Sequence, residues 1–165
     1  MLRLILMRHA KSDWNHIGTA DHDRPLNKRG RRSATALGVW LRAQGHIPDE
    51  VLCSSAERTG QTLMGLQIDP TPPTRFIRAL YLAEPRIMIE TLHEATGVCV
   101  LMIGHNHGIC ELANLLVESP PAHARFADYP TGATLVCDFD VGSWTEVDWH
   151  QGRVVDFIVP RELTD

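Results

Sequence analysis

The sequence lacks the features that would place the protein in a membrane or outside the cell. No apolar run in the 165 residues approaches the roughly 18 residues that a membrane-spanning helix needs. The apolar segment near the N-terminus, residues 4–7, is too short for a signal peptide. Only four cysteines occur and none forms a CxxC pair, so we expect reduced thiols in apolar surroundings. These absences predict a cytoplasmic protein with no membrane partner.

Several motifs with well-known chemistry are also absent. The chain contains no GxxxxGK[ST], GxGxxG, GxSxG or HExxH, so P-loop nucleotide hydrolysis, dinucleotide binding and serine-hydrolase chemistry lack support. Aromatic residues make up 6% of the chain, and the four tryptophans are too dispersed for a base-stacking platform. The net charge of -4 is unfavourable for electrostatic binding to the nucleic-acid backbone. We therefore expect no nucleic-acid partner.

Charge is distributed unevenly along the chain. Residues 1–32 contain eight Lys or Arg and three Asp, so this segment is basic although the whole chain is acidic. The four cations within residues 28–32 are predicted to form a solvated helix face. The basic segment as a whole could still receive a small anion.

The length and the apolar content indicate one globular domain. With 165 residues and 44% hydrophobic residues, the chain can bury a sizeable core. Short apolar runs alternate with helical periods, which is typical of βαβ units. We predict a single three-layer α/β/α domain over residues 1–165, with a mainly parallel sheet and antiparallel strands near the C-terminus. The run at 98–103 is apolar on both faces and is predicted to be a central strand.

The predicted elements follow from the period of the apolar residues. Strands are expected at 2–7, 50–53, 98–103, 134–139, 144–149 and 154–159. Helices are expected at 28–44, 54–67, 87–96 and 109–116. Ser54 and Glu57 have the spacing of a capping box, which predicts that the second helix begins at Ser54.

Unusual polar residues follow three of the predicted strands. The first strand ends in Arg8 and His9, the second is followed by Arg58, and the central strand is followed by His105. In open α/β sheets, ligands bind beyond the carboxyl ends of the parallel strands. These four side chains are therefore expected to surround one pocket.

That combination of side chains suits a phosphate group. Two guanidinium groups and the N-terminus of a helix can bind a phosphate dianion, and a histidine ring can attack phosphorus. The two arginine charges are expected to lower the histidine pKa values, so that a lone pair stays available at neutral pH. No carboxylate is expected in this cluster, which disfavours a metal site.

Three motifs resemble, in this order, the motifs of the histidine phosphatase superfamily, also called the phosphoglycerate mutase-like family. They are LMRHAKSDWN at 6–15, SSAERTGQT at 54–62 and IGHNHG at 103–108. The short length and the stretches DHDRPLNKRG at 21–30 and YPTGATLVCDFD at 129–140 are similar to the SixA-type phosphohistidine phosphatases. The resemblance covers residues 2 to about 160. It implies an enzyme that needs no cofactor or metal ion and acts on a phosphorylated protein or a small phosphorylated molecule.

The resemblance also implies roles for individual residues. His9 would be the phosphorylated nucleophile, and Arg8 and Arg58 would grip the phosphoryl oxygens. His105 would donate a hydrogen bond to the same group and stabilise the charge that develops during transfer.

Two asparagines are further candidates for substrate binding. Asn15 falls where related mutases have a phosphate-contacting asparagine, but a turn is an equal alternative. Asn106 could contact the substrate or cap the helix that follows His105.

The general acid is the least defined part of the resemblance. Larger members of the family place a glutamate after the second helix, and the nearest carboxylate here is Glu84, with Asp13 as a second candidate; either could instead be solvated or structural. Ala10 also replaces the usual glycine. A phosphohistidine leaves as imidazole, whose conjugate acid has a pKa near 6.5, so a site without a strong acid favours P–N over P–O cleavage. We therefore expect protein phosphohistidine as the substrate, with a small phosphomonoester as the alternative.

Three other interpretations remain open at this point. A metal-dependent hydrolase could use His105 and His107 with Asp21, His22 and Asp23 as ligands. A phosphoglycerate mutase would require a longer chain. A non-catalytic phosphate-binding interaction module is an alternative of another class.

Overall fold

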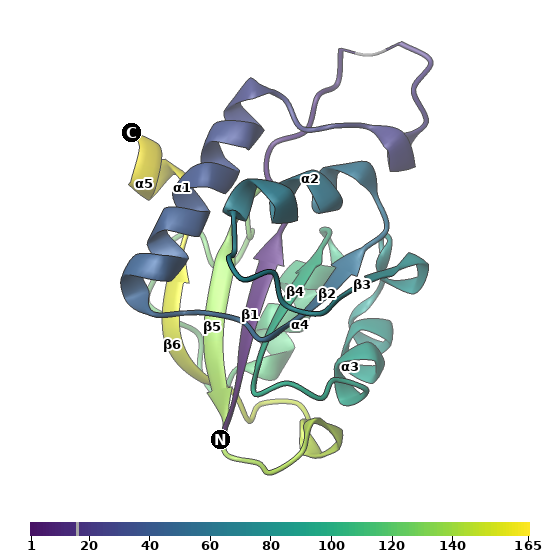
Figure 1. The fold of residues 1–165 in the computed structure, drawn as a ribbon. Coiled ribbons are helices and arrows are strands. Elements are labelled where there is room, and N and C mark those ends of the chain that lie inside the picture. The colour runs from purple at the N-terminus through teal and green to yellow at the C-terminus, as the bar shows by residue number, and fades with distance from the viewer. Residues whose placement is uncertain (16) are drawn as a thin grey trace.

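The computed structural model describes residues 1–15 and 17–165, which form one sheet with helices on both faces (Figure 1). The strands are β1 (Leu2–Arg8), β2 (Glu50–Ser54), β3 (Thr74–Ile77), β4 (Cys99–Gly104), β5 (Thr134–Phe139) and β6 (Arg153–Ile158). The α-helices are α1 (Lys28–Gln44), α2 (Glu57–Leu66), α3 (Pro85–His93), α4 (Gly108–Leu116) and α5 (Arg161–Thr164). Three short 3-10 helices are η1 (Asp21–Asp23), η2 (Arg78–Leu80) and η3 (Trp144–Glu146).

The sheet combines a parallel part with an antiparallel edge. Its strand order is β3-β2-β4-β1-β5-β6. The first four strands in this order are mutually parallel, whereas β5 is antiparallel to β1 and β6 to β5. The predicted α/β class, the antiparallel C-terminal strands and the central position of β4 are confirmed.

Both faces of the central strands are buried, which explains their continuous apolar runs. Along β1, Leu4 and Leu6 pack on the side of α3 and α4, and Ile5 and Met7 pack on the side of α1 and α2. All four side chains are fully buried, and each contributes about 1.5–3 kcal/mol by leaving water. Figure 1 shows the two helical layers on either side of the sheet.

Helix α1 forms as the sequence predicts, from 28 to 44. Asn27 caps its N-terminus by accepting a hydrogen bond from the Gly30 N–H (2.8 Å). Gly45 ends it with a φ of 74°, in the left-handed region that glycine adopts without strain. The four cations of its first turns are exposed, as expected for a solvated face: Lys28, Arg29, Arg31 and Arg32.

The predicted start of the second helix is wrong. Helix α2 begins at Glu57 with Ala56 in the N-cap position, and no side chain caps it. Ser54 is instead the last residue of β2, where its hydroxyl contacts a ring nitrogen of His105. Ser54 is therefore committed to a partner that comes from a distant part of the chain.

Two errors concern strands. The expected strand at 144–149 is instead η3 and a turn, because Ser143 and Glu146 form a capping box and the buried indole of Trp144 donates to the Gly97 carbonyl (2.6 Å). Strand β3 is missed. It is a four-residue edge strand whose side chains are exposed or half-buried, so it lacks the apolar run by which the other strands are recognised.

Neither disulfides nor membrane-spanning helices are found among the described residues. All four cysteines are free; Cys53 and Cys137 are buried, while Cys99 and Cys110 are partly exposed. Among the described residues, no helix combines the length and apolar character needed to cross a bilayer.

The register of the parallel strands aligns their carboxyl ends. Ile103 of β4 pairs with Met7 of β1 on one side and with Cys53 of β2 on the other. The residues that follow these three positions therefore emerge at one edge of the sheet, the upper edge in Figure 1. This edge carries the candidate active site.

Candidate active site

The structure brings together the four side chains that the sequence singles out. The ring centres of His9 and His105 lie 5.3 Å apart, and Nε of Arg58 lies 3.4 Å from Nε2 of His9. These three residues are each at most 5% exposed. Arg8 precedes His9 at the end of β1 and is partly buried. The spatial expectation therefore holds, while the catalytic roles of the four residues stay predictions.

Hydrogen bonding fixes the orientation of the His9 ring. Its Nδ1 lies 2.7 Å from the carbonyl oxygen of Ala10, which can only accept, so Nδ1 carries the proton. The lone pair is then on Nε2, on the side of Arg58. The Ala10 N–H donates to the hydroxyl of Thr62 (3.0 Å), and this hydroxyl donates to the Arg58 carbonyl (2.7 Å). Helix α2 thereby holds the segment after β1 in place.

Both imidazoles are held in the neutral form. Burial lowers the pKa of His9 well below its usual value, and the charges of Arg8 and Arg58 add to this effect, while the bond to Ala10 opposes it. The pKa of His105 falls to about 3, again mainly through burial and then through Arg58. The predicted direction is therefore right, but loss of hydration is a larger cause than the arginine charges.

A carboxylate that was not expected from the sequence lies in the cluster. Arg58 donates from Nη1 to the Asp21 carbonyl (2.7 Å) and from Nη2 to its carboxylate (3.1 Å). Burial opposes ionisation of Asp21, but hydrogen bonds from Tyr81 and Arg24 and the Arg58 charge outweigh it and keep its pKa below the usual value. The expectation of a cluster free of carboxylates is thus wrong. The carboxylate serves to fix Arg58.

Tyr81 is the residue of this site that sequence reasoning missed. Its hydroxyl donates to Asp21, and its ring meets the His105 ring edge to face at 5.3 Å. Tyr81 follows η2, which continues directly from β3. Since parallel strands end at one edge, recognition of β3 would have directed attention to the residues after it.

Arg8 is oriented by the loop that precedes β5. Its Nη1 donates to the Tyr129 carbonyl (3.1 Å). Tyr129 is fully buried; its hydroxyl donates to the Leu6 carbonyl (2.5 Å) and accepts from the Leu135 N–H (3.1 Å). Burial, followed by the charge of Arg58, lowers the pKa of Arg8. Two guanidinium groups are therefore held at this edge in spite of their mutual repulsion.

Asn106 does not cap the following helix, so that alternative is wrong. His107 occupies the N-cap position of α4, without a side-chain hydrogen bond. The amide of Asn106 instead donates to the carbonyls of Asp128 (3.1 Å) and Tyr129 (3.2 Å). Its substrate contact stays a prediction.

Several buried polar atoms at this edge have no hydrogen-bond partner among the described residues. They are Nε of Arg8, Nδ1 of His105 and Oδ1 of Asn106. Nε2 of His105, by contrast, contacts the Ser54 hydroxyl (2.7 Å). Buried polar groups are normally satisfied, so three such atoms without a partner at one edge of the sheet are typical of a binding site.

The remaining candidates lie at the periphery. Asn15 is exposed, and its N–H donates to the Asp13 carboxylate (2.8 Å), which is the geometry of a turn. Glu84 is exposed in the N-cap position of α3. This segment passes beside the loop after β4, because a Cβ on Gly108 would overlap the Ala83 carbonyl. The roles predicted for Asn15, Asp13 and Glu84 stay predictions.

The proposed metal ligands do not assemble into one group. In the part of the chain that the structure describes, no three or more His, Cys, Asp or Glu side chains are close enough to share a metal ion. Asp21 is bonded to Arg58 and Arg24, whose charges repel cations. His22 lies 2.8 Å from the Ser55 hydroxyl.

Comparisons with known proteins agree with the motifs. The model of the histidine phosphatase superfamily (branch 1) matches residues 4–80. The uncharacterized protein Rv1276c of Mycobacterium tuberculosis is 38% identical over 162 residues, which cover 94% of this chain and 100% of the relative.

Solved structures show the similarity over nearly the whole chain. The putative phosphohistidine phosphatase SixA from Nakamurella multipartitia is 29% identical with a TM-score of 0.82, and the alignment covers 96% of each chain. The putative SixA from Agrobacterium tumefaciens is 25% identical with a TM-score of 0.83, covering 96% of this chain and 98% of that one. With its motifs, family match and SixA-like fold in agreement, the chain belongs to the histidine phosphatase superfamily.

Proposed function

We propose that the protein is a metal-independent phosphatase that forms a phosphohistidine intermediate on His9 and acts on protein phosphohistidine. The observation that carries this proposal is the His9 ring. It is buried and neutral, its proton is on Nδ1, and its Nε2 lone pair lies beside Arg58. A neutral imidazole among guanidinium groups can attack an anionic phosphoryl group that those guanidinium groups bind.

The reaction has two steps. Nε2 of His9 forms a bond to phosphorus while the bond between phosphorus and the leaving group breaks. Water then attacks phosphorus, the bond to Nε2 breaks, and inorganic phosphate leaves. Charge on the phosphoryl oxygens is stabilised by N–H groups of Arg8 and Arg58 in both steps.

His105 would act as a further donor to the phosphoryl group. The Ser54 hydroxyl oxygen accepts from the Ala56 N–H (3.3 Å), so its own proton is free to donate to Nε2 of His105 (2.7 Å). In that arrangement the proton of the neutral ring is on Nδ1, the atom that is buried without a partner among the described residues. Nδ1 would then donate to a phosphoryl oxygen.

The expected preference for phosphohistidine rests on the lack, among the described residues, of a protonated carboxyl group beside His9. Asp21 is held ionised by its donors, so it has no proton to give to a leaving alkoxide. Imidazole can be protonated before it leaves and needs a weaker acid. Glu84, at the rim, is the candidate acid if phosphomonoesters are turned over. A cytoplasmic location also stays a prediction.

Rapid-quench labelling tests the intermediate. A peptide with ³²P-labelled phosphohistidine should transfer label to the wild-type protein within one turnover, and the label should be stable in alkali and labile in acid. His9→Ala should take up no label, whereas His107→Gln, which alters an exposed histidine two residues beyond His105, should label normally. Turnover by His9→Ala at the wild-type rate would refute the mechanism.

The alternatives give different results in two simple assays. A metal-dependent hydrolase would lose activity in EDTA, whereas the proposed enzyme would keep it and be inhibited by vanadate. A small-molecule phosphomonoesterase would turn over sugar phosphates with a kcat/KM at least equal to that for the phosphohistidine peptide. An interaction module would bind the peptide without turnover.

A further inference from the structure

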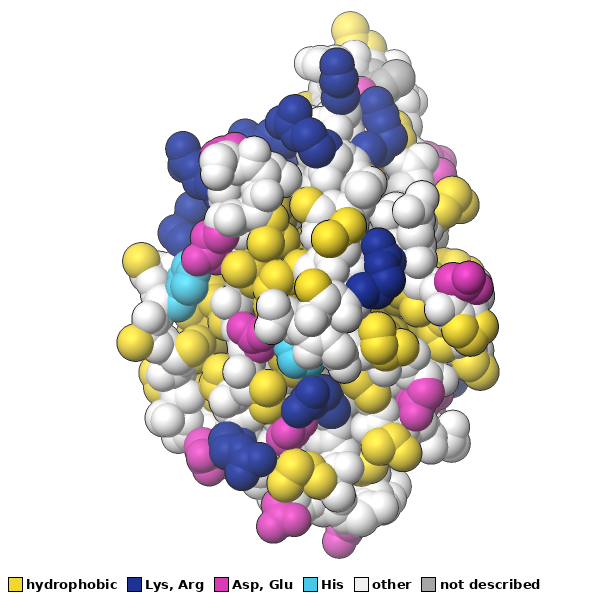
Figure 2. Space-filling view, turned by 60° about the vertical axis from the view of Figure 1, so that its left-hand side comes forward, with side chains coloured by type: hydrophobic (Ala, Val, Ile, Leu, Met, Phe, Trp, Pro, Cys, Tyr) yellow, Lys and Arg dark blue, Asp and Glu magenta, His cyan; other side chains and the backbone are white. Residues whose placement is uncertain are grey.

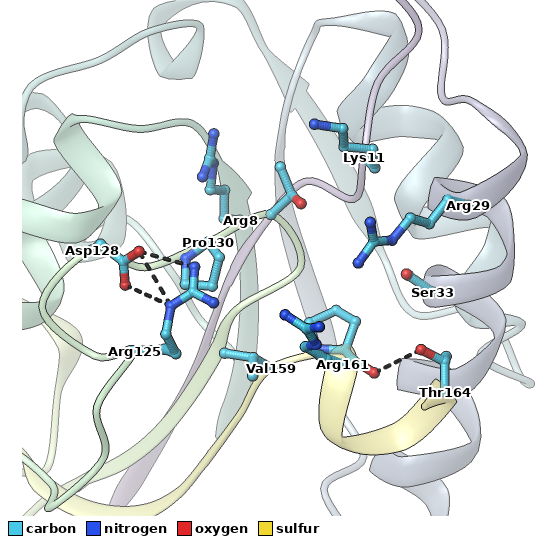
Figure 3. Close-up of a pocket in the computed structure, with 12 residues that line it drawn as sticks. Arg8, Lys11, Arg29, Ser33, Arg125, Asp128, Pro130, Val159, Arg161 and Thr164 are labelled. Atoms are coloured by element: carbon cyan, nitrogen blue, oxygen red, sulfur yellow. Dashed lines mark hydrogen bonds and ion pairs between the residues drawn. The ribbon is translucent and has the colours of Figure 1, made fainter.

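A second concentration of positive charge adjoins Arg8. A pocket of about 380 Å³ lies between α1, α5 and the loop that precedes β5 (Figure 3). We call it the basic pocket. Its lining residues are Arg8, Lys11, Arg29, Ser33, Arg125, Asp128, Pro130, Thr131, Val159, Pro160, Arg161 and Thr164.

The basic pocket contains five cationic side chains and one carboxylate. That carboxylate, on Asp128, is bonded to Arg125 at 2.9 Å, so it neutralises one cation of the lining. Arg161 has a partner outside the lining, Asp165, at 3.2 Å. These two ion pairs leave the positive charges of Arg8, Lys11 and Arg29 unbalanced.

Lys11 and Arg29 are the available cations. Both are exposed, and neither side chain has a hydrogen-bond or ion-pair partner among the residues that the structure describes. In Figure 3, the charged ends of Lys11 and Arg29 point into the pocket, and Arg125 lies on its other side. Lys and Arg side chains also gather at the upper end of the molecule in Figure 2. The chain as a whole has a net charge of -4, so this local positive potential attracts an anion to the basic pocket.

The basic pocket is connected to the candidate active site through one residue. Arg8 lines the pocket and is also the residue before His9. A phosphoryl group on His9 and an anion in the basic pocket can therefore belong to one substrate molecule that passes Arg8.

We infer that the basic pocket is a subsite for a second anionic group of the phosphorylated substrate, with Lys11 and Arg29 as its specificity-determining cations. This inference rests on the proposed function. The anionic group is either a carboxylate of an acidic side chain near the phosphohistidine or a second phosphate of a small molecule. Both are bound by the same charge-assisted contacts.

The double variant Lys11→Gln/Arg29→Gln tests the inference. Glutamine removes the charges while leaving polar side chains, and the two exposed positions contribute little to the core. Arg32→Gln is the matched control, because Arg32 is an exposed cation of the same helix outside the lining. Phosphoramidate turnover by the wild-type protein checks the proposed function separately, since this compound has no second anionic group.

Two pairs of probes distinguish the source of the anion. The first pair is a phosphohistidine peptide flanked by glutamates and the same peptide flanked by glutamines. The second pair is butane-1,4-diol bisphosphate and butyl phosphate, measured as inhibitors. If phosphoramidate is not turned over, the proposed function fails. The basic pocket is then tested by binding alone, with fluorescence anisotropy of the labelled peptides.

The expected result is a preference of the wild-type protein for the glutamate peptide that falls roughly five- to tenfold in the double variant, the size expected for two exposed charge pairs. The fall should shrink in 1 M salt, where the screening length is about 3 Å. A fall confined to the bisphosphate pair would assign the subsite to small molecules. An unchanged ratio for both pairs, or an equal fall in Arg32→Gln, would overturn the inference.

Discussion

The two ends of β1 use the same residue types in opposite ways. At the amino end, Arg3 makes two hydrogen bonds to the Asp138 carboxylate (2.7 and 3.0 Å), and buried His46 lies 3.1 Å from Asp156. There Arg3 and His46 each have a carboxylate as partner. At the carboxyl end, Arg58 is bonded to the Asp21 carboxylate, whereas Arg8, His9 and His105 make no hydrogen bond or ion pair with a carboxylate of the described residues.

This difference indicates what each end is for. A charge pair with matched partners is complete and stabilises the fold, although buried pairs gain little net energy. An excess of buried donors and positive charge is unfavourable until an anion arrives, so it is retained where an anion binds. The comparison supports the proposal that the amino end contributes stability and that the carboxyl end binds a phosphate group.

The largest expected effect is that of Arg58→Gln. It removes the proposed phosphoryl contact and one of the bonded partners of Asp21, so kcat/KM for the phosphohistidine peptide should fall roughly 10³-fold. Steady-state kinetics well below the melting temperature of the variant measures this. A decrease of less than tenfold in a folded variant would show that the carboxyl end does not depend on this guanidinium group.

Acid should destabilise the protein through the neutral imidazole of His105. Its pKa is about 3 in the folded protein and near 6.5 when unfolded, so the unfolded state binds an extra proton between these values. The contribution of His105 alone to the free energy of unfolding should fall by about 1.4 kcal/mol per pH unit as pH drops from 6.5 towards 3. Denaturant titrations at pH 6.5, 5.5 and 4.5 should show a flatter dependence in His105→Gln, and parallel curves would contradict a buried neutral ring.

Arg3→Gln should affect stability alone. It leaves the buried carboxylate of Asp138 with Arg153 at 3.9 Å as its remaining partner, so the free energy of unfolding should decrease by about 2 kcal/mol. Because Arg3 lies at the opposite end of β1 from His9, kcat should not change. Denaturant unfolding and kinetics on the same preparation measure both, and a tenfold loss of kcat would end the division between the two ends.

Ser54→Ala is expected to have the smallest effect. It removes the hydrogen bond to Nε2 of His105, which contributes about 1 kcal/mol, so kcat should fall roughly fivefold with little change in KM. Ser54→Thr keeps the hydroxyl and should restore most of the activity. If alanine and threonine behave alike, the hydroxyl does not position His105.

Local sequence signals predicted most of the fold. The both-face burial of β4 and the period of α1 could be read directly, because apolar spacing reports the layers that cover an element. The signals failed where a distant partner takes over a residue. Ser54 has the spacing of a helix cap but faces His105, and β3 pairs with β2 without an apolar pattern of its own.

The main residues of the site were predicted from the sequence, but the charges and hydrogen bonds around them were predicted only in part. Arg8, His9, Arg58 and His105 follow strands, so strand prediction alone was enough to expect them together. Asp21 and Tyr81 come from short connecting segments whose positions depend on β3 and the loop after β1. For the same reason, burial could not be recognised as the main cause of the low histidine pKa values.

The sequence by itself determined the layered α/β fold, its superfamily and the four side chains at the strand ends, because periodicity and motifs are properties of local segments. Only the tertiary structure decided that a carboxylate holds Arg58, that the imidazoles are neutral, and that a basic pocket adjoins Arg8. Each of these depends on groups far apart in the chain that lose water or gain partners when they are brought together.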